Sequence, residues 1–134
     1  MKLIVTLKGE AKNTLSSIAG IYVLEPKLVN DKSYWLQDPN SNAIWYDKQY
    51  RGWNVGSQDD LGSSAALIIS QEDVAGPQEA TTWQIANGKQ FIVSDDILVD
   101  TFVEPGTYIQ IIHSMAIRVV EFSNGGYKIR KIFA

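Results

Sequence analysis

The sequence contains no cysteine and only one histidine. Without cysteine the chain can form no disulfide, no thiolate zinc site and no cysteine nucleophile. Such a composition suits a reducing compartment, and we predict a cytoplasmic protein. Long apolar runs are also missing, since no window approaches the ~20 residues of a membrane span. The apolar run Leu3–Leu7 ends too soon for the core of a signal peptide, so we predict no membrane partner.

A dominant basic surface is missing as well. The net charge is −3 at pH 7, and the charges are unevenly distributed. Residues 56–96 carry seven acidic residues and one basic residue, whereas residues 107–134 carry four basic residues and one acidic residue. A protein that binds the phosphate backbone needs a basic face. The sequence therefore predicts no nucleic-acid partner.

Catalytic motifs are absent. The single histidine, His113, falls inside an apolar strand pattern, where a packed or edge residue is the commoner role. No Gly-x-Ser-x-Gly elbow marks a nucleophile. We predict that the chain is not an enzyme. A hydrolase built on His113 and a carboxylate stays open as a minor hypothesis.

One segment superficially follows a calcium loop. Asp38, Asn40 and Asn42 have the spacing that opens an EF-hand. The sixth position is Ala43 in place of glycine, and the twelfth is Gln49 in place of the bidentate glutamate. We interpret the segment as a hairpin turn that uses asparagine and aspartate side chains.

Two pairs of adjacent acids, Asp59-Asp60 and Asp95-Asp96, lie in or beside predicted loops. Adjacent acids in turns are usually solvated, although two such pairs could converge on one calcium ion. The segment from Gly56 to Gly62 has two glycines but lacks the lysine of a phosphate-binding loop. We predict no metal and no cofactor.

Short β segments separated by turn residues extend through the chain. Leu3, Val5 and Leu7 alternate with other residues, as in a strand with one buried face. Pro26 should end the second strand, and Asn87-Gly88 predicts a type I′ hairpin turn. The predicted strands cover residues 3–7, 19–24, 33–37, 43–47, 53–55, 65–70, 83–86, 89–94, 107–113, 115–122 and 127–133.

Regular turn signals with no long helix are typical of antiparallel β folds. We therefore predict an all-β protein, a single domain over residues 1–134. The expected architecture is an antiparallel β-sandwich or barrel of about nine to eleven short strands, with at most short helical turns.

Aromatic residues are the strongest lead to function. Tyr34-Trp35 and Trp45-Tyr46 are consecutive pairs. Successive side chains of a strand point to opposite faces, so one of each pair should leave the core unless the sheet is covered on both sides. Exposed aromatics are typical of binding hot spots. The candidate partner-binding residues are Trp35, Trp45, Tyr46, Tyr50 and Trp53.

The aromatic spacing resembles a known type of module. Its elements here are Gly20-Ile21-Tyr22, Tyr34-Trp35, Ile44-Trp45-Tyr46, Trp53-Asn54-Val55-Gly56, Pro77, Trp83-Gln84-Ile85, Gly88 and Phe91. Over about residues 20–95 the chain is similar to a small aromatic-rich β module repeated in eukaryotic multidomain proteins. The resemblance implies a β fold. That module has no single function, so it implies no site residues.

The last predicted strand is basic. Lys128, Arg130 and Lys131 lie opposite Arg118 across the C-terminal hairpin. Charge of this kind protects an edge strand from sticking to other sheets. An acidic partner for this strand is the alternative.

These observations favour a non-enzymatic binding module that acts through a protein–protein surface, with a protein partner or a homodimer as the partner. The competing hypothesis is a lectin-like carbohydrate-binding domain that uses the same aromatics. Its hydroxyl partners would be Asn40, Asn42, Asp59 and Asp60.

Overall fold

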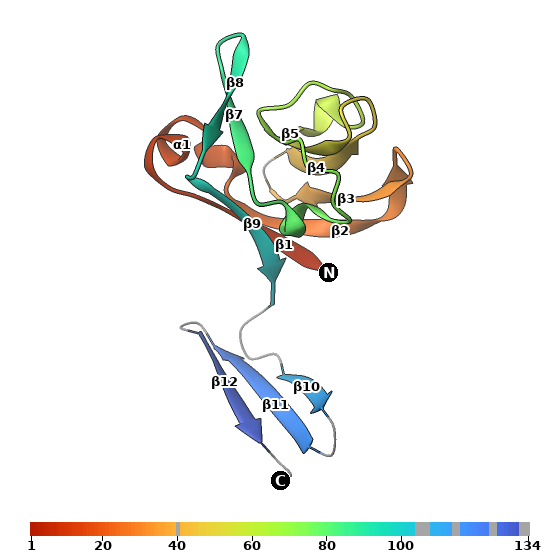
Figure 1. The fold of residues 1–134 in the computed structure, drawn as a ribbon, viewed down its shortest axis with the longest axis vertical. Helices are drawn as coiled ribbons and strands as arrows, with labels where there is room; N and C mark the ends of the chain where they lie inside the picture. The colour runs from red at the N-terminus through yellow and green to blue at the C-terminus, as the bar shows by residue number, and fades with distance from the viewer. Residues whose placement is uncertain (40, 104–107, 114–115, 124–125, 132–134) are drawn as a thin grey trace. The chain divides into compact units, whose positions relative to one another are not determined.

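A computed structural model describes residues 1–39, 41–103, 108–113, 116–123 and 126–131, with side chains described up to Val103. The chain forms two compact units, Met1–Phe102 and Val103–Ala134 (Figure 1). That the chain acts as one domain stays a prediction.

Nine strands, one α-helix and three single 3-10 turns make up the first unit. The strands are β1 (Lys2–Leu7), β2 (Gly20–Val29), β3 (Lys32–Gln37), β4 (Asn42–Asp47), β5 (Gly52–Ser57), β6 (Ile68–Ser70), β7 (Trp83–Asn87), β8 (Gln90–Ser94) and β9 (Ile97–Phe102). The helical segments are α1 (Gly9–Thr14), η1 (Ser16–Ile18), η2 (Gln58–Asp60) and η3 (Pro77–Glu79).

The nine strands form one antiparallel sheet in the order β8-β7-β6-β5-β4-β3-β2-β1-β9. The sheet curls into a half-barrel, with β8 at one edge and β9 at the other (Figure 1). Four neighbouring pairs, β2–β3, β3–β4, β4–β5 and β7–β8, are joined by short hairpin turns, which explains the frequent local turn signals in the sequence. The all-β prediction is confirmed, and the sheet is a partly open barrel.

The core fills the concave face of the half-barrel. In β1, Leu3, Val5 and Leu7 are buried as the alternation predicts. They pack in one cluster with Ile18 and Tyr22. The Tyr22 hydroxyl donates to the carbonyl of Ile18 at 2.6 Å, and burial raises the pKa of this phenol. β1 and the segment from Ile18 to Tyr22 are therefore part of the core.

The second unit is a three-stranded antiparallel sheet in the order β10-β11-β12. Its strands are β10 (Tyr108–His113), β11 (Ala116–Ser123) and β12 (Gly126–Lys131). The three predicted C-terminal strands are thus present. The predicted charged strand, β12, lies at an edge of this sheet.

Three local predictions are wrong. β2 continues past Pro26 to Val29, because the register shifts between Leu24 and Leu28 and the proline falls in that irregular stretch. The tight turn lies at Gly88-Lys89, since Asn87 still pairs with Gln90. Of the two turn residues, only Gly88 has a positive φ, 66°, which fits a type II′ turn in place of type I′.

One strand was missed altogether. β9 pairs with β1 along its whole length, from Leu7 opposite Ile97 to Lys2 opposite Phe102. The alternation of buried Ile97 and Val99 with exposed neighbours is the signal that identifies it.

Among the described residues, no helix has the length and apolar character needed to cross a membrane.

Candidate functional site

The structure divides the five predicted binding aromatics unequally. Trp35, Trp45, Tyr46 and Trp53 are all buried, with at most 7% of their surface exposed. Tyr50 is 60% exposed. Tyr50 is therefore the member of the predicted set that can meet a partner directly.

Three of the buried aromatics pack together on the concave face. The Trp35 and Trp53 rings meet edge to face with centroids 6.0 Å apart, and Tyr46 meets Trp53 in the same way at 5.5 Å. Tyr46 lies directly opposite Trp53 in the β4–β5 ladder. The Lys32 ammonium lies 4.9 Å from the Tyr46 ring centroid. Such edge contacts add to the free energy of burial, so this cluster stabilises the fold.

Trp45 is buried on the opposite face of the sheet. The loop that follows η2 covers it, and the Trp45 Nε1 donates to the Ser63 carbonyl at 2.9 Å. Asn54, opposite Trp45 in the ladder, donates to the same carbonyl at 3.3 Å. Both members of the pair Trp45-Tyr46 are buried because the sheet is covered on both sides here.

The β4–β5 turn holds Tyr50 in a fixed position. Asp47 Oδ1 accepts hydrogen bonds from the Gln49 and Tyr50 amides at 2.9 and 3.1 Å, and the Asp47 carbonyl accepts from the Arg51 amide at 2.8 Å. Arg51 has a φ of 57°, in the left-handed region. Asp47 is buried, and its Oδ2 accepts from Asn54 at 3.1 Å. A buried carboxylate thus fixes the turn backbone that carries an exposed ring.

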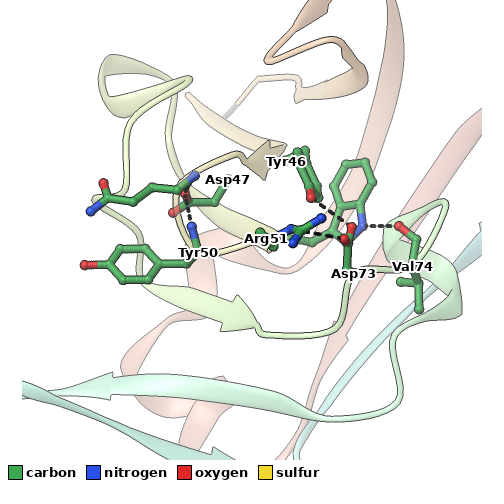
Figure 2. A network of polar contacts seen from close by, with 8 residues as sticks. Tyr46, Asp47, Tyr50, Arg51, Asp73 and Val74 are labelled. Carbon is green, nitrogen blue, oxygen red and sulfur yellow. Dashed lines mark hydrogen bonds and ion pairs between the residues drawn. The ribbon is translucent and has the colours of Figure 1, made fainter.

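A second network lies beside this turn (Figure 2). The Tyr46 hydroxyl donates to Asp73 Oδ1 at 2.8 Å, and Arg51 Nε lies 3.5 Å from Asp73 Oδ2. The hydrogen bond to Asp73 is the main cause that raises the pKa of Tyr46. The Trp53 Nε1 donates to the Val74 carbonyl at 2.9 Å. Figure 2 shows the Tyr50 ring directed away from Asp73.

Tyr50 borders a cleft of about 280 Å³, called here the Tyr50 cleft. Ile69 and Phe91 supply its other apolar walls, and Phe91 is 37% exposed. Asn54 and Gln71 line it with polar groups. Asp47, Ser64 and Ser70 line it as well, so the cleft combines two exposed rings with a largely polar wall that can accept and donate hydrogen bonds.

Glu72 fixes the loop between β6 and β7, close to the cleft. Its Oε2 accepts hydrogen bonds from the Thr81 and Thr82 amides at 2.7 and 2.8 Å. Its Oε1 accepts from the Thr81 hydroxyl at 2.8 Å. These bonds, the Thr82 amide first, hold the pKa of Glu72 below its usual value. The loop thus depends on an ionised carboxylate.

The polar residues of the carbohydrate hypothesis lie elsewhere. Asn42 is buried and donates to the Ser17 carbonyl and to Gln37 Oε1. Asp59 and Asp60 are exposed in η2 and do not line the Tyr50 cleft. Asn40 lies outside the described residues. The structure thus separates this set from Tyr50.

The described part of the chain contains no cluster of three or more histidine, aspartate or glutamate side chains that could hold a metal ion. Asp95 and Asp96 follow β8, and Asp59 and Asp60 form η2. His113 is the last residue of β10, and its backbone lies opposite Ala116. The structure does not describe its side chain. The hydrolase hypothesis stays a prediction.

A second hollow of about 410 Å³ lies between α1 and the β7–β8 hairpin. Ile92 and Val93 of β8 line it, together with Glu10 and Asp96. β8 therefore borders both hollows, since Phe91 lines the Tyr50 cleft. Sequence reasoning missed β8 as a surface. Phe91, Ile92 and Val93 form an apolar run after the turn, but such a run also fits a buried strand, so the sequence alone does not mark it as a surface.

The comparisons with known proteins found no match: no family model, no curated protein and no solved structure is similar to this chain.

Proposed function

We propose that this chain is a non-enzymatic protein-interaction module, and that the Tyr50 cleft receives a side chain of the partner. The observation that carries this proposal is a largely exposed aromatic ring on a turn held by Asp47, beside a preformed cleft. Because the backbone that carries this ring is already fixed, binding orders only the side chain and loses less entropy than the ordering of a free loop would. Tyrosines in such settings are typical hot spots. The predicted cytoplasmic location is part of this proposal.

The buried aromatics support this assignment indirectly. Trp53 and Tyr46 anchor the segments on either side of the turn through Val74 and Asp73. They therefore hold the frame on which Tyr50 is presented. We assign them to the scaffold and assign the partner contact to Tyr50 and Phe91.

The test is affinity capture from the native source with three forms of the protein: wild type, Tyr50→Ala and Leu28→Ala. Leu28 is the matched control, since it is 63% exposed and does not line the cleft. A partner should be captured by wild type and by Leu28→Ala, and its affinity for purified Tyr50→Ala should be lower by about 2 kcal/mol. Tyr50→Ala should unfold at the wild-type temperature.

Equal capture of every protein by all three forms would contradict the proposal. So would a partner lost equally from Tyr50→Ala and Leu28→Ala, because that loss would not depend on the cleft.

A carbohydrate-binding function is the second candidate. It is favoured by the polar groups of Asn54 and Gln71 beside the Tyr50 ring. It is weakened by Asp47, whose two oxygens already accept from two amides, from Asn54 and from the Ser64 hydroxyl. A glycan array distinguishes the two functions. Selective binding that disappears in Tyr50→Ala would favour carbohydrate, and a blank array would leave the protein partner.

A further inference from the structure

β8 is an edge strand with unused hydrogen-bonding groups. Asn87 and Gln90 close a two-residue turn, so Gln90, Ile92 and Ser94 direct their amide and carbonyl groups toward β7. Phe91 and Val93 then direct theirs away from the sheet. Within the described part of the chain, no hydrogen bond engages these outward groups of Phe91 or Val93.

The side chains of this edge are apolar and accessible. Phe91, Ile92 and Val93 are 37%, 45% and 60% exposed. No charged residue occurs from Gln90 to Ser94. Exposed edges are normally protected by charge, proline or a covering segment. The opposite edge, β9, has a charged residue, Asp100.

Charges flank the strand in a self-complementary way. Lys89 precedes β8 and Asp95 follows it, and both are exposed. Two copies can pair antiparallel with the two-fold axis at Ile92. Each residue of one copy then faces the residue of the other copy that lies equally far from Ile92 on its opposite side. Lys89 of one copy then faces Asp95 of the other, twice. Phe91 faces Val93, twice, and both have outward hydrogen-bonding groups, as a bonded antiparallel pair requires.

We propose that β8 is a homodimerisation edge, at which a second copy of this chain adds its own β8 antiparallel in this register. The interface is isologous, so a single strand supplies both halves. Backbone pairing gives the affinity, as in other strand additions. The Phe91–Val93 pairs and the flanking Lys89–Asp95 pairs fix the register. This proposal does not rest on the function of the Tyr50 cleft.

The experiment is sedimentation equilibrium of the full chain at concentrations up to about 1 mM. Wild type should dimerise. Val93→Lys should be monomeric, because it places two like charges within the paired edges. Leu98→Lys on β9 is the matched control, since Leu98 is 58% exposed on the other edge, and it should dimerise as wild type does.

The register is tested by charge exchange. Lys89→Glu and Asp95→Lys should each raise the dimer dissociation constant about tenfold, because two-fold symmetry repeats each repulsive pair. The double variant Lys89→Glu/Asp95→Lys should return to the wild-type value. These residues are exposed, so at concentrations where wild type is monomeric the thermal transition should be unchanged in all three variants, and it would reveal a loss of fold.

A monomeric wild type would overturn the proposal. A dimer that survives Val93→Lys, or that is lost in Leu98→Lys alone, would place the interface elsewhere and overturn it as well. If the double variant stays as weak as the single ones, the register is wrong. Tyr50→Ala should leave the dimer intact, so failure of the Tyr50 proposal and failure of this one are separate results.

Discussion

β4 and β8 are strands of similar length in one sheet, but they differ in how far their side chains are buried. All six residues of β4 are buried, whereas the first four residues of the five-residue β8 are exposed. β4 has neighbours on both sides and is covered on both faces, while β8 has one described neighbour, β7. Each strand nevertheless has an apolar run at its centre, Ala43–Tyr46 in β4 and Phe91–Val93 in β8. Position in the sheet therefore decides whether an aromatic or branched side chain stabilises the fold or is left available for a partner.

The largest effect is expected where the sheet interior has no free space. A Cβ at Gly52 would overlap the Ser70 carbonyl oxygen of the neighbouring strand, and that backbone cannot move without breaking the β5–β6 ladder. Gly52→Ala should lower the free energy of unfolding by roughly 3 kcal/mol or more. Chemical denaturation measures this loss.

Gly88 at the tip of the β7–β8 hairpin is the matched control. A Cβ there would meet no atom within 4 Å, although its φ of 66° disfavours alanine. Gly88→Ala should therefore cost only about 1 kcal/mol. If the two substitutions cost the same, close approach of backbone in the interior is not what separates the two regions.

The second largest loss of unfolding free energy should distinguish two buried aromatics, Trp53 and Trp35. Trp53 donates its Nε1 hydrogen to the Val74 carbonyl, whereas Trp35 Nε1 is buried and has no hydrogen-bond partner among the described residues. Replacement by phenylalanine removes similar volume in both cases. Trp53→Phe should cost about 1–2 kcal/mol more than Trp35→Phe, because it also leaves the Val74 carbonyl unsatisfied. Equal losses of unfolding free energy would show that the Val74 bond contributes nothing net.

The local features of this fold could be predicted from the sequence. The alternation of Leu3, Val5 and Leu7 determines a strand within a few residues and was identified. The β7–β8 hairpin was identified too, although its turn was placed one residue too early and given the wrong type. The continuation of β2 beyond Pro26 was not predicted, because a register shift depends on how the partner strand fits. Local patterns thus specified the strands but not their irregularities.

The candidate site was only partly predictable for the same reason. Trp45 is buried and not exposed as predicted, because a loop from residues 58–67 covers the second face of the sheet. This contact joins segments that are distant in the sequence. Tyr50 was identified as an aromatic residue, but its exposure comes from the Asp47 turn. Phe91 was missed because its strand looks like any apolar strand until its place at the edge is known.

The smallest effect concerns the loop next to the cleft and its dependence on pH. The pKa of Glu72 is lowered in the folded state, so the ionised form stabilises the loop above the usual carboxyl pKa. This contribution is lost as the pH falls through the lowered folded-state pKa. The Thr81 and Thr82 amides donate to Glu72, and their NMR signals should move together on acidification. In Glu72→Gln this transition should be absent at every pH, while β4 and β5 keep their spectrum. A variant that still shows the transition would mean that another group controls the loop.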